Sequence, residues 1–167
     1  MSLYLFSVWL HVVAAAAWVG SMLFFAIVVV PAMRAPDAAA GAAPLLRALG
    51  ERYRAYGWGS LAVLLVTGTG NLLLRGIGWT LLSSGEFWST GFGRALAAKL
   101  AVVVLVVCAT AGHDVWMRSG ATRKVLENRA SPEALRYRRW ASRVGRSTLI
   151  LSLVVLYFAV VLVRGAP

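Results

Sequence analysis

The sequence predicts an all-α integral membrane protein, a bundle of four helices that cross the bilayer. Of the 167 residues, 60% are hydrophobic and only 14% are charged, and the mean hydropathy is +0.75. A soluble domain of this size would be far more polar. Four apolar stretches also reach the length of about 20 residues that a helix needs to cross a hydrocarbon core.

The four predicted spans belong to a single domain and lie near residues 3–33, 56–76, 91–116 and 146–164. The first starts at Met1 without a basic segment and is longer than the apolar part of a signal peptide, so we expect it to stay in the protein as a helix. We expect loops at 34–55 and 117–145. Within the second loop, Ser131 and Pro132 are typical of the start of a short helix.

The distribution of basic residues predicts the orientation of the chain. The loops 34–55 and 117–145 carry most of the 17 Lys and Arg residues, and cytoplasmic loops are rich in these residues. We therefore expect a multi-pass protein of a bacterial-type inner membrane, with both termini on the outer, periplasmic side. The two basic loops, which would lie beside anionic headgroups, explain most of the net charge of +11. No nucleic-acid-binding motif is visible in the sequence.

Two ionisable side chains lie inside the predicted spans at the same depth. His11 and Lys99 each follow the outer end of a span by eight residues, which corresponds to about 12 Å. Because a charged group in a bilayer costs several kcal/mol, such residues normally face the bundle interior and mark functional sites. The two side chains therefore predict a polar layer in the outer half of the bundle.

Neighbouring residues indicate what this layer holds. Trp18 shares a helix face with His11, while Thr67, Gly68 and Asn71 reach the same depth on the second span and Tyr157 on the fourth. Small residues beside a histidine leave room for a flat cofactor, although they also occur wherever helices pack closely. Thr67, Asn71 and Tyr157 are candidate hydrogen-bonding groups for a ligand or substrate.

The second histidine, His113, lies about 21 Å deeper than Lys99, toward the cytoplasmic side. It therefore cannot ligate a cofactor together with His11. We expect an interfacial residue at this position, and a second metal or haem ligand is the alternative.

Three segments resemble a known family. "LHVVAAAAWVG" with the following "FF", "RYRAYGWGSLAVLLVTGTGNLLLRG" and "GFGRALAAKLAVVVL" are similar to the copper-resistance protein D superfamily. His11 and Lys99 also resemble the histidine and lysine of HemJ-type protoporphyrinogen oxidases, a resemblance that implies binding of haem b. The chain departs from the HemJ type because it lacks Asn-Glu-x-Pro before the last helix.

The first functional hypothesis is a haem b-binding redox protein, whose activity as an oxidoreductase would come from the cofactor. His11 would be an axial ligand of the iron, and Lys99 a sixth ligand, a proton donor or a charge partner. Arg75 and Arg94 would hold the propionates at the outer mouth. A quinone or a redox protein would be the partner, and a homodimer is compatible with the sequence.

Copper handling is the second hypothesis, and a structural subunit of a membrane complex is the third. Copper would use His11 with Met22, the one methionine near a histidine face. Copper(I) prefers sulfur ligands, and the chain has only four Met and one Cys.

Overall fold

The computed structural model describes residues 2–32, 42–118 and 131–165, and all regular structure within these ranges is helical. Four helical segments are long and apolar enough to cross a membrane: Leu3–Ala32, Leu49–Leu74, Gly91–Trp116 and Arg139–Arg164. The predicted fold class is thus confirmed. The orientation of the termini stays a prediction.

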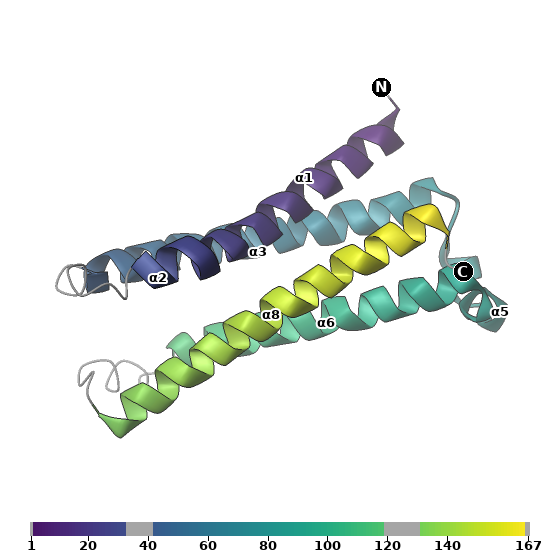
Figure 1. Ribbon diagram of the computed structural model, residues 1–167. Helices are drawn as coiled ribbons and strands as arrows, with labels where there is room; N and C mark the ends of the chain where they lie inside the picture. The colour runs from purple at the N-terminus through teal and green to yellow at the C-terminus, as the bar shows by residue number, and fades with distance from the viewer. Residues whose placement is uncertain (1, 33–41, 119–130, 166–167) are drawn as a thin grey trace. The chain divides into compact units, whose positions relative to one another are not determined.

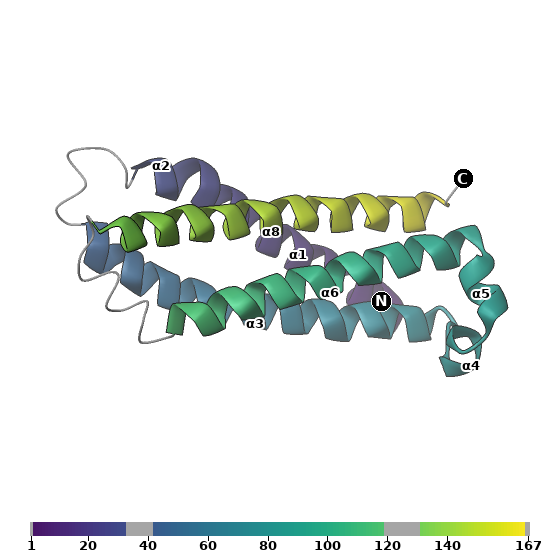
Figure 2. The same cartoon turned by 90° about the horizontal axis from the view of Figure 1, so that it is seen from below.

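The chain divides into two compact units, Met1–Gly85 and Glu86–Pro167. In the first unit, α1 (Leu3–Phe24) packs against α3 (Ala42–Leu74). In the second, α6 (Gly91–Arg118) packs against α8 (Pro132–Arg164). Each unit is a helical hairpin whose long helices run antiparallel, as Figures 1 and 2 show.

Two of the helices are longer than the sequence analysis expected. α3 begins at Ala42 and α8 at Pro132, so helix occupies 42–55 and 132–145, where loops were expected. Ala, Leu, Glu and Arg fill much of these stretches, and all are good helix formers. Pro132 starts α8 at a position where its missing N–H costs nothing, but the helix then continues into the fourth span instead of ending as a short one.

The end of α1 contains a local change of helix type. Phe25–Val29 (η1) forms one π-helical turn, and Val30–Ala32 (α2) completes the span. The wider turn ends beside Pro31, whose nitrogen has no hydrogen to donate to the helix. At this level the ring of Phe25 packs against Tyr53 of α3, with 4.4 Å between the centroids.

A glycine ends α3. Gly76 has a φ of 81°, its N–H donates to the Leu73 carbonyl, and the N–H of Ile77 donates to the Leu72 carbonyl. This is a Schellman motif, in which the left-handed residue is normally glycine. The chain then forms two short helices, α4 (Trp79–Leu82) and α5 (Gly85–Ser89), before α6.

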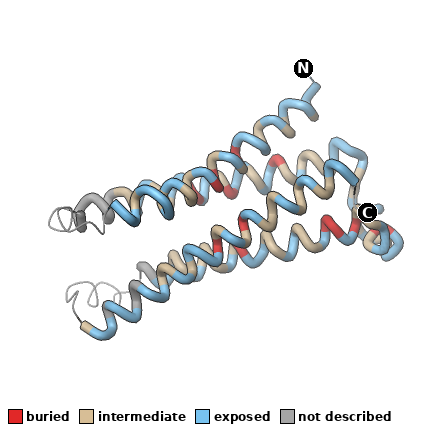
Figure 3. The backbone as a smooth tube through the Cα atoms, viewed as in Figure 1, coloured by how far each residue is buried: buried red, intermediate tan, exposed pale blue. Residues whose placement is uncertain are grey.

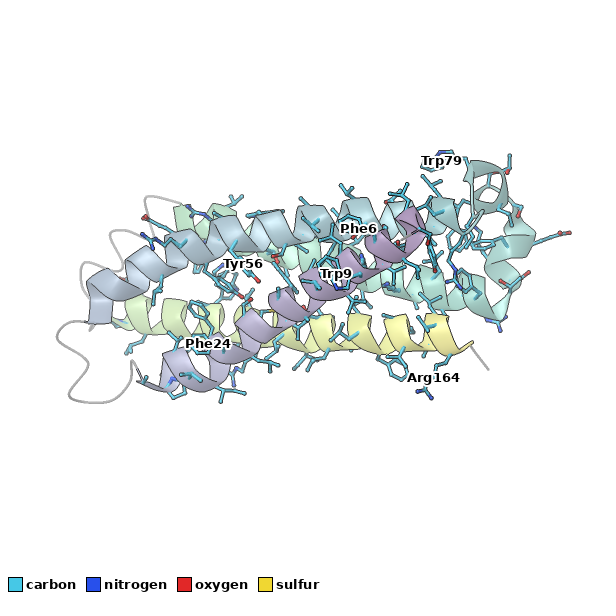
Figure 4. All side chains as sticks on the ribbon, turned by 90° about the horizontal axis from the view of Figure 1, so that it is seen from above. Phe6, Trp9, Phe24, Tyr56, Trp79 and Arg164 are labelled. Carbon is cyan, nitrogen blue, oxygen red and sulfur yellow. The ribbon has the colours of Figure 1, made fainter. Side chains whose placement is uncertain are left out.

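Buried side chains are few, and they lie mainly where helices of one pair face each other. Figure 3 shows short buried patches on helices whose other described residues are intermediate or exposed. Many exposed side chains are large and apolar, such as Phe6, Trp9, Phe24 and Trp79 (Figure 4). Apolar helix surfaces of this extent suit contact with lipid, where burial inside the protein is not required.

Three hydroxyl groups within the spans of the second unit bond to carbonyls of their own helices. Thr110 and Thr148 donate to the carbonyls of Val106 and Val144, and Ser152 donates to the carbonyl of Thr148. Each bond reaches back four residues, so the polar groups are paired without water, as a membrane interior demands.

Close packing at the start of α6 requires a glycine. The Thr90 hydroxyl accepts a hydrogen bond from the Gly93 N–H at 2.9 Å and donates to the Phe87 carbonyl at 2.6 Å. A Cβ on Gly93 would overlap that carbonyl group and approach Trp88 Cα to 2.9 Å. Backbone atoms cannot give way as a flexible side chain can, so a larger residue would open the turn between α5 and α6.

We therefore expect Gly93→Ala to destabilise the protein by about 1–3 kcal/mol, the usual range for overpacking. Thermal unfolding in detergent measures this loss as a lower midpoint. Gly112→Ala is the matched control, since Gly112 lies on the same helix and a Cβ there would have nothing within 4 Å; it should unfold at the same temperature or higher. Equal midpoints for the two variants would contradict the packing argument.

Candidate functional site

The imidazole of His11 is held between the two helices of the first unit. The side chain leaves α1 half-buried, and Nδ1 lies 2.8 Å from Thr67 Oγ1 of α3. A hydrogen bond of this length between residues 56 positions apart in the sequence fixes the rotation of the ring. His11 and Thr67, both predicted site residues, are therefore in direct contact.

The residues around Thr67 extend this contact. The Thr67 side chain is buried, and its hydroxyl donates to the Val63 carbonyl at 2.6 Å. The Ser7 hydroxyl donates to the Thr67 carbonyl at 3.5 Å. Ser7 and Val63 were not among the predicted residues, although Ser7 precedes His11, and Val63 precedes Thr67, by four residues, a spacing that places each pair on one helix face.

Glycines of α3 lie opposite the larger side chains of α1. A Cβ on Gly68 would lie 3.2 Å from His11 Cε1, and a Cβ on Gly57 would lie 3.2 Å from Trp18 Cζ3. A Cβ on Gly70 would lie 3.6 Å from the hydroxyl oxygen of Ser7. The space that Gly68 leaves is therefore next to the His11 ring itself. Gly57 was not predicted, because its ring neighbour lies on another helix.

The other predicted residues of the first unit lie at different levels of the helix pair. Trp18 is buried, seven residues after His11 and about 10 Å further along α1. Asn71 lies one turn beyond Thr67 on α3, and its Oδ1 is buried with no hydrogen-bond partner among the described residues. Arg75 is exposed directly after α3.

Three further predicted residues lie in the second unit. Lys99 is half-buried on α6, and within this unit no described group accepts a hydrogen bond from its ammonium. Arg94 donates from Nη1 to the Ser89 carbonyl at 2.7 Å, which links α6 to the end of α5. Tyr157 is exposed on α8, with its ring against that of the adjacent Phe158. Since His11 and Lys99 belong to different units, the common layer stays a prediction.

His113 is part of an aromatic cluster in the second unit. Its ring lies parallel to that of Trp140 on α8, at an interplanar angle of 8° and a centroid distance of 6.0 Å. Trp140 also makes an edge contact with Trp116, at 4.1 Å. Tryptophans are common at the membrane–water interface, and the interfacial position expected for His113 stays a prediction. Trp140 was not predicted, because the contact joins two helices.

The geometry of α1 separates the proposed copper ligands. His11 and Met22 are eleven residues apart on one continuous helix, which places them about 16 Å apart along its axis. They cannot bind the same ion. The described residues also contain no group of three or more His, Cys, Asp or Glu side chains suited to a metal.

Comparisons with known proteins identify the family. Residues 47–162 match the family described as Copper resistance protein D, a range that contains Thr67, Gly68 and Lys99 but not His11. An uncharacterized protein of Aquifex aeolicus (strain VF5) is 35% identical over 152 residues, which cover 90% of this chain and 89% of that protein. No solved structure matches the chain. The chain belongs to the copper resistance protein D family of membrane proteins.

Proposed function

We propose that this membrane protein binds haem b through His11 and acts as a redox protein. The observation that carries the proposal is the seating of the His11 ring, with Nδ1 bonded to Thr67 and Cε1 opposite Gly68. An imidazole whose Nδ1 is held by the protein would coordinate iron through Nε2, and the bond at Nδ1 keeps the ring in place.

The proposal assigns the other parts of such a site to residues that the sequence analysis singled out. A bound haem b provides one-electron redox chemistry at its iron. Arg75 and Arg94 would pair with its propionates, and Lys99 would act as a sixth ligand, a proton donor or a charge partner. The buried Asn71 Oδ1 would accept a hydrogen bond from a ligand or substrate, and a quinone or a redox protein would exchange the electron.

Copper handling is the second candidate, because the family is described by copper resistance. A copper site in this chain would need ligands other than the pair His11 and Met22, given their separation along α1. An absorption spectrum of the purified protein, oxidised and reduced, together with its copper content separates the two candidates. A Soret band supports haem, while a colourless protein with one copper per chain overturns it in favour of copper.

We also propose that the basic ends of the hairpins face the cytoplasm of a bacterial-type inner membrane. Arg136, Arg139, Arg143 and Arg146 are exposed near the start of α8, on the same side of the helix because their spacing is three or four residues. They would contact anionic headgroups. Both termini would then lie outside.

The first test of the haem proposal compares the two histidines. His11→Ala should lose most or all of the haem, because it removes the proposed axial ligand, whereas His113→Ala should keep most of it. Haem content per chain is measured as the pyridine haemochrome after purification in detergent. Retention in the His11 variant with loss in the His113 variant would place the site at the other end of the protein.

The second test uses the glycine beside the ring. Gly68→Ala should move the imidazole by a few tenths of an ångström and alter the position or width of the Soret band, since its Cβ would lie 3.2 Å from His11 Cε1. Gly59→Ala on the same helix has nothing within 4 Å and serves as the control. If both variants keep the wild-type spectrum, the iron is not bound next to Gly68.

The orientation is tested by labelling single cysteines in intact cells. In a chain with Cys108 replaced by Ala, a cysteine at Ser84 should react with a membrane-impermeant maleimide, and a cysteine at Asn128 should react only after lysis. The reverse pattern would contradict the assignment of the basic loops to the cytoplasm.

A further inference from the structure

The hydrogen bonds around Thr67 determine which ring nitrogen of His11 carries the hydrogen. A threonine hydroxyl has one hydrogen to donate, and Thr67 Oγ1 lies 2.6 Å from the Val63 carbonyl oxygen. A carbonyl oxygen can only accept, so this short contact requires the Thr67 hydrogen. The Leu64 carbonyl oxygen also lies 3.5 Å from Thr67 Oγ1. With the hydrogen directed to Leu64 or to His11 instead, lone pairs of Thr67 Oγ1 and the Val63 oxygen would face each other at 2.6 Å.

The Thr67 hydroxyl oxygen therefore accepts the hydrogen bond that it shares with His11. His11 Nδ1 lies 2.8 Å from it, and the remaining partner in that bond must donate. A neutral imidazole carries its hydrogen on one nitrogen and a lone pair on the other. Donation from Nδ1 places the lone pair of His11 on Nε2.

We propose that Thr67 is the positioning residue of this site, whose hydroxyl accepts the hydrogen of His11 Nδ1 and so keeps the imidazole in the tautomer that ligates through Nε2. The bonds form a directed chain, from His11 through the Thr67 hydroxyl to the Val63 carbonyl. Thr67 thus acts on the histidine, whereas the sequence analysis expected it to bond to a ligand or substrate.

Two features make this arrangement specific to Thr67. The side chain is buried, so bulk water does not compete for the hydrogen bond. Gly68 next to it adjoins Cε1, the ring carbon between the two nitrogens, where a Cβ would lie 3.2 Å away, so the missing side chain gives the ring room to reach the hydroxyl. The consequence for a haem site, which rests on the proposed function, is a more electron-rich ligand, because a hydrogen bond from the second nitrogen raises the basicity of the first.

The decisive experiment reads the tautomer directly, without haem. Protein labelled with ¹⁵N-histidine, produced without haem supply in a His113→Gln background, gives two-bond ¹H–¹⁵N correlations from His11 alone. We expect the pattern of an Nδ1–H imidazole in this protein and in Thr67→Ser, which keeps the hydroxyl. Thr67→Val, which keeps the shape but not the acceptor, should shift the pattern toward Nε2–H.

The matched control is Thr148→Val. Thr148 is equally buried, with an exposed fraction of 7% like that of Thr67, and its hydroxyl also donates to a carbonyl four residues back. This variant removes the same kind of bond without touching a histidine, so the His11 pattern should not change. An Nε2–H pattern in the protein with Thr67 intact, or no change in Thr67→Val, overturns the proposal.

A haem titration of the same variants separates this inference from the proposed function. Thr67→Val should bind haem about 10–100-fold more weakly, the usual effect of removing the hydrogen-bond partner of a ligating histidine, and Thr67→Ser should bind close to normally. If the tautomer follows Thr67 but no variant binds haem, the positioning role stands and the haem function is wrong. If haem binds through His11 with the same affinity in Thr67→Val, the positioning role is wrong.

Discussion

The hydrogen bond between His11 and Thr67 is the contact on which the candidate site depends. It joins α1 to α3 and sets the rotation of the only imidazole in the described part of the first unit. Interhelical hydrogen bonds in membranes contribute on average about 0.6 kcal/mol. A contribution of this size matters little for stability, but it is enough to favour one ring orientation and one tautomer.

The contact is possible because α3 presents little bulk at this level. Gly57 and Gly68 face the rings of Trp18 and His11, so the helices approach closely with large side chains between them. In lipid, helices associate through such van der Waals packing and not through the release of water. The same glycines that let the hairpin form thus also shape the surroundings of the histidine.

The two histidine rings have different partners. His11 is bonded to a side chain of the neighbouring helix. In the second hairpin, Thr148 and Ser152 bond to carbonyls of their own helix, and His113 packs on the face of Trp140. A ring stacked in this way suits an anchor at the interface, while a ring fixed by a directed hydrogen bond suits a ligand.

The family match covers only one side of the contact between His11 and Thr67. The matched range includes Thr67 and Gly68 of α3 but begins after α1. Thr67 therefore lies inside the matched range, and His11 lies outside it. A copper site in a protein draws on several ligands at once, and the described residues contain no group of three or more His, Cys, Asp or Glu side chains suited to one. Haem binding at this position stays a proposal, which the histidine variants test.

The sequence by itself determined the helical membrane class and the four apolar segments, and it singled out His11, Thr67 and Gly68 as candidate site residues. Hydropathy and position along a helix are local properties that the sequence carries directly. It did not determine the true starts of α3 and α8, where helix-forming residues carry the helix beyond the apolar span. Nor did it reveal Gly57 under Trp18, Trp140 beside His113, or the direction of the bond at Thr67. These depend on which faces of two distant helices meet, and only tertiary packing decides that.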